Sequence, residues 1–244
     1  MGTAYHWALG WLGISKGRGH PLPPEMPRCA SQPAPGPTLE PASADLGRRL
    51  WQEASPAAGT LVPVYLASRR LTLPDDAPLR FHPAAWRNRA NGLTGPAMLA
   101  QMTDPATAKP LGVHVTYLRP DGSEKAEGAG AKIKLGRAGV VRLVPDEEVA
   151  EGLGLAEGIE TALATMQHFQ WAPVWAAGDA GSIAGFPVLN GIEELTVFAD
   201  SDDRGAGLGA ARKCASRWAK AGRLARITAA PAGSDFADLA WRAA

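Results

Sequence analysis

Two acidic segments of this chain end in residues that could bind a metal ion. Residues 155–162 contain Glu157, and residues 196–203 contain Asp200 and Asp202. Each segment is an apolar run that ends in carboxylates. Carboxylate oxygens are the ligands that Mg²⁺ prefers, and two like charges held close together are best tolerated when a cation lies between them. These three residues are therefore candidates for one metal site.

The sequence around these carboxylates predicts short strands that alternate with helices. The predicted strands are 152–156, 174–177, 195–199 and 226–229, and the predicted helices are 158–169, one turn near Ile183, and 205–221. Strands joined by helices form a parallel sheet, and ligands bind at its carboxyl edge. We therefore expect an α/β fold over residues 150–244, with a small parallel four-stranded sheet flanked by helices and the carboxylates at one edge.

A smaller α+β region is predicted before this sheet, over residues 44–149. The predicted helices are 44–54 and a short one within 59–71, and the predicted strands are 97–103, 111–119 and 131–144. Pro120, Asp121 and Gly122 predict a turn between the last two strands, because glycine supplies the positive φ that such turns need.

The N-terminal residues do not predict a further domain. Residues 17–43 are expected to be a linker, since eight of the 21 prolines lie between Gly17 and Pro41. Within the N-terminal segment 1–16, one short helix is expected from residue 4 onward.

The composition is that of a globular protein, with 45% apolar and 20% charged residues. No apolar stretch approaches the ~20 residues that a membrane span requires, and His6, Gly10 and Gly13 interrupt any signal-peptide pattern. Cys29 and Cys214 are too few and too far apart for a disulfide framework or a zinc site. We therefore expect a cytoplasmic protein without zinc and without a membrane partner.

The net charge of +1 conceals a division between a basic and an acidic block. Residues 80–142 hold ten Lys and Arg against four Asp and Glu, whereas residues 143–244 hold eight against fourteen. Lys132, Lys134 and Arg142 lie just before the acidic block and are candidates for binding the phosphates of nucleotides or nucleic acid. The alternative is that these cations lie on an ordinary solvated strand face.

A third acidic pair, Asp235 and Asp238, lies near the C-terminus. It could contribute to the metal site. Equally, Ser234 or Asp235 could cap a last helix.

Together these motifs resemble the Toprim fold of bacterial primases, topoisomerases and some nucleases. The motifs are strand-Glu-Gly-x-x-Thr-Ala, strand-Asp-x-Asp-x-x-Gly and Ser-Asp-x-x-Asp-Leu, and the resemblance covers roughly residues 150–240. It is closest to the Toprim domain of phage and mobile-element primase-like proteins. Residues 65–71, 112–122, 132–136 and 141–143 also resemble the segment that precedes Toprim in that family, although Val115 stands where the family often has arginine.

The resemblance implies that Asp200 and Asp202 hold one or two Mg²⁺ or Mn²⁺ ions, while Glu157 acts as a general acid or base or as a further ligand. It implies primer synthesis on single-stranded DNA from nucleoside triphosphates in phage or mobile-element DNA replication, with a separate helicase as a further partner. The alternatives are a Toprim nuclease that cleaves phosphodiesters and a catalytically idle nucleic-acid-binding remnant. Members of the family commonly begin with a zinc module, and we expect residues 1–16 to be the tail of a missing one.

Overall fold

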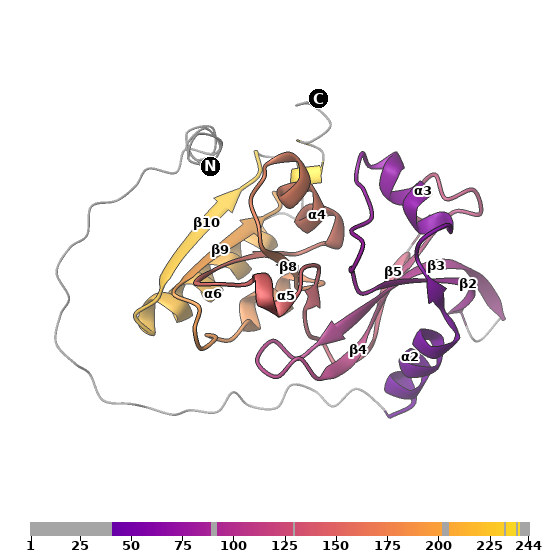
Figure 1. Ribbon diagram of the computed structural model, residues 1–244, viewed down its shortest axis with the longest axis horizontal. Coiled ribbons are helices and arrows are strands. Elements are labelled where there is room, and N and C mark those ends of the chain that lie inside the picture. Colours follow the sequence, from indigo (N-terminus) through magenta and orange to yellow (C-terminus); the bar gives the residue numbers. More distant parts are fainter. Residues whose placement is uncertain are drawn as a thin grey trace.

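The computed structural model describes residues 41–88, 92–128, 130–201, 205–231, 233–237 and 239. Figure 1 shows two units side by side, the first drawn in indigo to magenta and the second in red to yellow. The helix expected near the N-terminus and nearly all of the expected linker lie outside the described residues. In the part of the chain that is described, no helix is both long and apolar enough to cross a membrane.

The first unit is an antiparallel sheet of five strands with two helices, in the order β1-β2-β3-β4-β5. Its elements are α2 (Pro41–Glu53), β1 (Ser55–Pro56), α3 (Leu61–Ser68), β2 (Leu79–Asn88), β3 (Leu93–Thr103), β4 (Pro110–Tyr117) and β5 (Lys132–Gly136). The α2 helix covers one face, where Leu46 and Leu50 pack with Leu99, Val113 and Val115. The α+β character predicted for this region is confirmed.

The β2 strand was not predicted from the sequence. Pro83 interrupts its apolar pattern, and a proline cannot donate a hydrogen bond to a neighbouring strand. The structure accommodates it at a register shift between His82 and Ala85, where β2 pairs with β3 irregularly.

The second unit is a sheet of five strands in the order β10-β9-β7-β8-β6. Its elements are β6 (Val141–Arg142), the 3₁₀ turn η1 (Asp146–Glu148), β7 (Gly152–Ala156), α4 (Ile159–His168), β8 (Val174–Ala176), α5 (Ala180–Gly185), β9 (Glu194–Ala199), α6 (Ala206–Lys220) and β10 (Leu224–Ala229). The strands from β7 to β10 pair in parallel, which confirms the predicted four-stranded sheet. The short β6 adds an antiparallel edge beside β8.

The single strand predicted over residues 131–144 was wrong. The chain leaves β5 at Gly136, whose φ of +88° lies in the left-handed region that glycine adopts without steric cost. Only then does it form β6, which belongs to the other sheet. These residues therefore connect the two units.

Helices cover both faces of the parallel sheet, as parallel strands require. On one face Leu163 of α4 packs against Val174 and Ala176. On the other face Ile183 of α5 and Trp218 of α6 pack against Leu155. The α4 helix therefore lies on the opposite side of the sheet from α5 and α6 (Figure 1).

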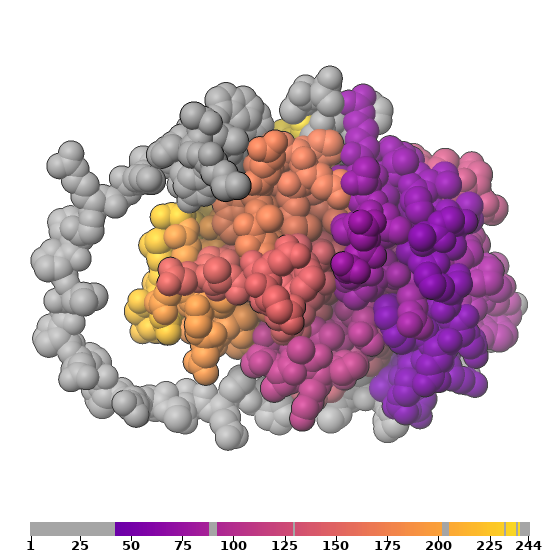
Figure 2. Space-filling view, in the orientation of Figure 1, coloured from indigo at the N-terminus to yellow at the C-terminus, as the bar shows by residue number. Residues whose placement is uncertain are grey.

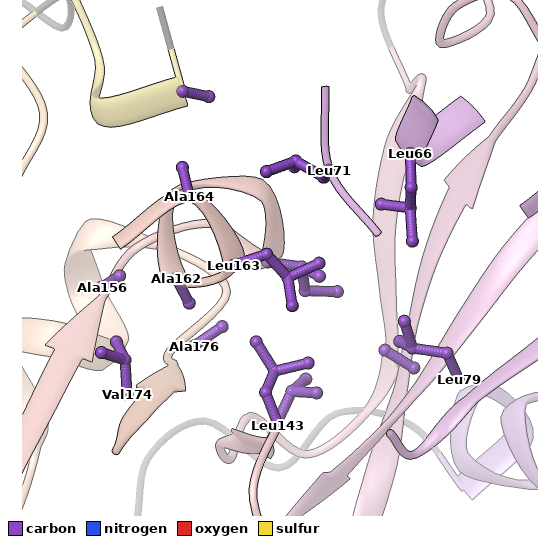
Figure 3. Packing of buried hydrophobic residues seen from close by; sticks show 14 of the residues in the cluster. Leu66, Leu71, Leu79, Leu143, Ala156, Ala162, Leu163, Ala164, Val174 and Ala176 are labelled. Atoms are coloured by element: carbon purple, nitrogen blue, oxygen red, sulfur yellow. The ribbon is translucent and has the colours of Figure 1, made fainter. Parts of the chain in front are cut away.

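One hydrophobic cluster joins the two units. It holds Leu66 from α3 and Met98 from β3 together with Ile159 from α4 and Phe198 from β9. Figure 3 shows side chains from both units converging on the same space, and Figure 2 shows the two units in contact along their boundary. Shared burial of this kind fixes the antiparallel unit against the parallel sheet.

Candidate active site

The chain connections create a switch point between β7 and β9. After β7 the chain passes through α4 to β8, whereas after β9 it passes through α6 to β10 on the other side of the sheet. The two helices lie on opposite faces, so they diverge at the carboxyl ends of these two neighbouring strands. Ligands of open α/β sheets bind in the crevice at such a point.

Glu157 and Asp200 each follow one of these two strands directly. Glu157 comes after Ala156, the last residue of β7, and Asp200 comes after Ala199, the last residue of β9. Both side chains are half-buried. The backbone carbonyl of Glu157 accepts a hydrogen bond from the Gly178 N–H at 2.8 Å, which fixes the start of the β7–α4 turn against the residues after β8.

Asp200 is held by the first turn of α4. The Thr161 hydroxyl donates to the Asp200 carboxylate, at 3.2 Å from Oδ2 and 3.5 Å from Oδ1. Thr161 is itself almost fully buried. This contact joins the end of β9 to the helix that follows β7, so the two acidic segments identified in the sequence meet in the structure.

The remaining predicted metal ligands are only partly described. Asp202 and Asp238 lie outside the described residues, and among the described ones no group of three or more His, Cys, Asp and Glu side chains is close enough to hold a metal ion. Glu157 and Asp200 nevertheless fit Mg²⁺ in chemistry, because both are hard oxygen donors at the switch point. They would need Asp202 or another oxygen donor to complete a site.

Asp235 lies beside a cation from the first unit. Its Oδ2 is 4.0 Å from Nη2 of Arg69, the residue that directly follows α3. Among the described residues near it, Ser234 donates to the Pro231 carbonyl at 2.7 Å. Whether Asp235 also binds metal stays a prediction.

Lys134 is the predicted phosphate ligand that lies against Gly178, whose N–H binds the backbone carbonyl of Glu157. Burial lowers the pKa of Lys134, and the negative charge of Glu157 opposes that shift. Its Nζ forms an ion pair with Asp179, the residue that caps α5 by accepting from the Ser182 N–H at 2.6 Å. A Cβ atom placed on Gly178 would lie 3.5 Å from Cδ of Lys134, so the lysine stem rests against the residues after β8.

Lys132 and Arg142 are bound to other groups. The Lys132 ammonium donates to Oε2 of Glu160 at 3.0 Å. The Arg142 guanidinium donates to Asp146 Oδ1 at 2.6 Å and to the carbonyls of Asp104 and Pro105. It also lies over the Trp175 ring, with its Cζ 4.3 Å from the ring centroid. The structure therefore does not bring the three predicted phosphate ligands together.

Sequence reasoning missed several residues around the site, namely Tyr65, His114, Glu160 and Asp179. Glu160 and His114 are buried at 6% and 5% exposure. Both residues lie in stretches whose apolar pattern predicts buried positions. A charged or titratable residue at such a position indicates a specific partner, because charged residues are rarely buried without one.

Comparison with known proteins divides the chain into two matched parts. Residues 152–244 match the family described as Toprim domain, and residues 41–143 match one described as a domain of unknown function (DUF7146). No curated protein matches the sequence.

Among solved structures, one contains a chain that aligns with most of this one. It is the structure of bacteriophage T7 lagging-strand DNA polymerase interacting with primase domains of two gp4 subunits bound to an RNA/DNA hybrid and dTTP. The identity is 12%, the alignment covers 78% of this chain and 86% of that chain, and the TM-score is 0.41. A TM-score this low does not establish a shared fold.

Proposed function

We propose that this chain, which carries a Toprim domain at residues 152–244, is a primase-like nucleotidyltransferase. It would use Mg²⁺ or Mn²⁺ to synthesise primers on single-stranded DNA from nucleoside triphosphates, in the replication of a phage or mobile element. The observation that carries the proposal is the placement of Glu157 and Asp200 at the switch point between β7 and β9. A separate helicase stays a predicted partner, and the cytoplasm a predicted location.

The carboxylates divide between two tasks in this proposal. Asp200 and Asp202 would hold the metal, with Asp235 and Asp238 as further candidates, and the bound ion would neutralise the charge that develops on the transferred phosphate. Glu157 would accept the proton of the attacking hydroxyl as that oxygen bonds to the α-phosphorus and pyrophosphate leaves. Thr161 supports the arrangement, because its hydroxyl orients the Asp200 carboxylate.

Among the three predicted phosphate ligands, the contacts favour Lys134. Its partner Asp179 is 43% exposed and can be hydrated when Lys134 turns to a phosphate. The partner of Lys132 is Glu160, which is only 7% exposed, so releasing Lys132 would leave a buried carboxylate without its cation. Arg142 would have to give up its contacts with Asp146 and two carbonyls.

The experiment is an incubation of the full chain with single-stranded DNA, Mg²⁺ or Mn²⁺, and labelled nucleoside triphosphates. Labelled oligoribonucleotides that depend on metal and template would support primer synthesis. Shortened DNA would replace the proposal with a Toprim nuclease, since cleavage can use the same carboxylates. Unchanged DNA and no product would indicate a catalytically idle remnant.

A further inference from the structure

A buried carboxylate connects the two units next to the proposed site. Glu160 lies in the first turn of α4, three residues after Glu157, and its side chain is 7% exposed. Its Oε1 accepts from the Tyr65 hydroxyl at 2.6 Å, and its Oε2 accepts from the Lys132 ammonium at 3.0 Å. Tyr65 belongs to α3 and Lys132 to β5, so one side chain binds two elements of the antiparallel unit.

Both partners of Glu160, Lys132 and Tyr65, favour the ionised form of its carboxylate. Burial alone would raise the pKa of Glu160, but the Lys132 charge and the hydrogen bond from Tyr65 outweigh burial and hold that pKa well below its ordinary range. Tyr65 is fully buried, and burial together with the neighbouring Glu160 charge raises the pKa of its hydroxyl far above the ordinary value. The hydroxyl therefore stays a donor.

His114 does not compete for Glu160. Burial and the charge of Lys132 lower the pKa of His114 to about 4, so the ring is neutral near pH 7. Its Nδ1 and the Thr116 hydroxyl are buried and have no hydrogen-bond partner among the described residues. Lys132 therefore supplies the larger share of the positive charge that balances Glu160, and Lys125 supplies a smaller share.

Lys132, which binds Glu160, and Lys134 lie on the same strand, β5. Lys132 and Lys134 are two residues apart on β5 and so point to the same face of the sheet. On that face Lys132 lies opposite Thr116, and Lys134 lies opposite His114. Among the described strands β5 is at the end of the sheet and pairs only with β4, so a side-chain anchor to α4 constrains where its next lysine lies.

We propose that Glu160 is a positioning residue for the site: by binding Lys132 and Tyr65 it fixes β5 against α4 and thereby places Lys134 against Gly178 and Asp179, next to the turn that carries Glu157. The inference rests on the proposed function for the role of Lys134 in phosphate binding. It assigns different tasks to two neighbouring lysines, since Lys132 anchors the strand and Lys134 faces the substrate. Glu160 and Tyr65 touch no reacting atom in this account.

The placement of Lys134 can be measured without any activity. The chain has seven lysines, so the titration of each labelled side-chain ammonium can be followed by NMR and assigned by substitution. In the wild type, Lys134 should titrate below the ordinary lysine range, because burial lowers its pKa. In Tyr65→Phe, which removes one hydroxyl and no charge, and in Glu160→Gln, its pKa should move back up as the strand is released.

The direction in which the pKa of Lys134 changes distinguishes displacement of β5 from the loss of a nearby charge. Loss of the Glu160 charge alone would lower the pKa of a nearby lysine or leave it unchanged. Release into solvent removes the burial that lowers the pKa of Lys134 and so raises it, and loss of the ion pair with the exposed, well-hydrated Asp179 opposes this only weakly. Lys132→Arg keeps the cation and should preserve the wild-type titration of Lys134. Glu194→Gln is the matched control, because it removes a carboxylate that pairs with Arg226 elsewhere on the parallel sheet. An unchanged Lys134 titration in folded Tyr65→Phe and Glu160→Gln would overturn the inference and leave Glu160 a stabilising residue only.

Binding of single-stranded oligo(dT) gives the functional readout. Lys134→Met should reduce the slope of log K against log salt by roughly 0.7, the value for one phosphate contact on a single strand. The same substitution in a Glu160→Gln background should cause little further change, whereas in a Glu194→Gln background it should cause the full reduction. A full reduction in both backgrounds would contradict the positioning role. If the wild type bound no single-stranded DNA, the proposed function would fail, and the NMR titration would still decide the inference.

Discussion

The Thr161 hydroxyl lies 3.2 Å from Oδ2 of Asp200 and donates a hydrogen bond to it. This single contact connects the helix after β7 to the residue after β9, across the switch point of the parallel sheet. Hydrogen bonds to a ligating carboxylate fix its orientation and its basicity. Thr161 therefore has a consequence for metal binding although it is not predicted to touch the metal.

Replacement of Thr161 should weaken metal binding more than it weakens the fold. Thr161→Val keeps the shape and removes the hydroxyl, so we expect Mn²⁺ affinity to fall by roughly 10- to 100-fold, as for other residues that orient metal ligands. Thr161→Ser keeps the donor and should retain affinity near that of the wild type. Isothermal titration calorimetry with Mn²⁺ measures both affinities. Equal affinities for Thr161→Val and the wild type would show that Thr161 does not orient a metal ligand.

Divalent metal should stabilise the folded protein. An ion that binds only the native state adds about 2.7 kcal/mol when its concentration is 100 times the Kd. We therefore expect the Tm to rise between EDTA and millimolar Mg²⁺ or Mn²⁺. Asp200→Asn should lose most of that rise, and an identical Tm with and without metal in the wild type would count against an assembled site.

The contribution of Glu160 to stability should depend on pH. Its folded-state pKa is depressed, so its stabilising effect is complete above the unfolded glutamate pKa of about 4.3 and is lost progressively as the pH falls from there through the lower folded-state pKa. The groups that face it are Tyr65, Lys132, Lys125 and His114.

The test compares Glu160→Gln with the wild type in urea. At pH 7 the variant should be less stable by about 3 kcal/mol, at the lower end for a broken buried pair because Lys132 can be hydrated. At pH 3 the difference should be smaller, because part of the effect is lost between the unfolded pKa and that pH. A difference that does not change between pH 7 and pH 3 would show that folding does not lower the pKa of Glu160.

Neutralising Lys134 and neutralising Arg142 should have different effects on the salt dependence of single-stranded DNA binding. Lys134→Met should flatten the salt dependence of single-stranded DNA binding by roughly 0.7 in the slope. Arg142→Met should leave the slope nearly unchanged, because its guanidinium is bound to Asp146 and stacks on Trp175. Filter binding from low to moderate salt measures both, and a larger effect for Arg142→Met would locate the DNA path beside Arg142 rather than Lys134.

The sequence predicted the parallel sheet and the position of Glu157 and Asp200 at the ends of two of its strands. Buried parallel strands are short apolar runs, and 152–156 and 195–199 are such runs followed at once by Glu157 and Asp200. Because the carboxyl ends of parallel strands share one edge, local patterns were enough to place these residues together.

The contacts between the two units could not be predicted in the same way. Tyr65 and Glu160 are 95 residues apart, and no local periodicity records which buried tyrosine meets which helix. Lys132 looked like a solvated or phosphate-binding lysine because its partner lies on another element. The β2 strand was missed for a local reason, since its Pro83 is tolerated only at an irregularity that the pairing with β3 creates.

The most direct test of the central claim is the turnover of Glu157→Gln in the primer-synthesis assay. The substitution preserves the size of the side chain and removes its charge and its capacity to take a proton. With metal, template and nucleoside triphosphates present, we predict that the rate of oligoribonucleotide formation falls by roughly 10²- to 10⁴-fold, while the Tm in EDTA stays near that of the wild type. Wild-type turnover by Glu157→Gln would contradict the assignment of the reaction to the carboxyl ends of β7 and β9.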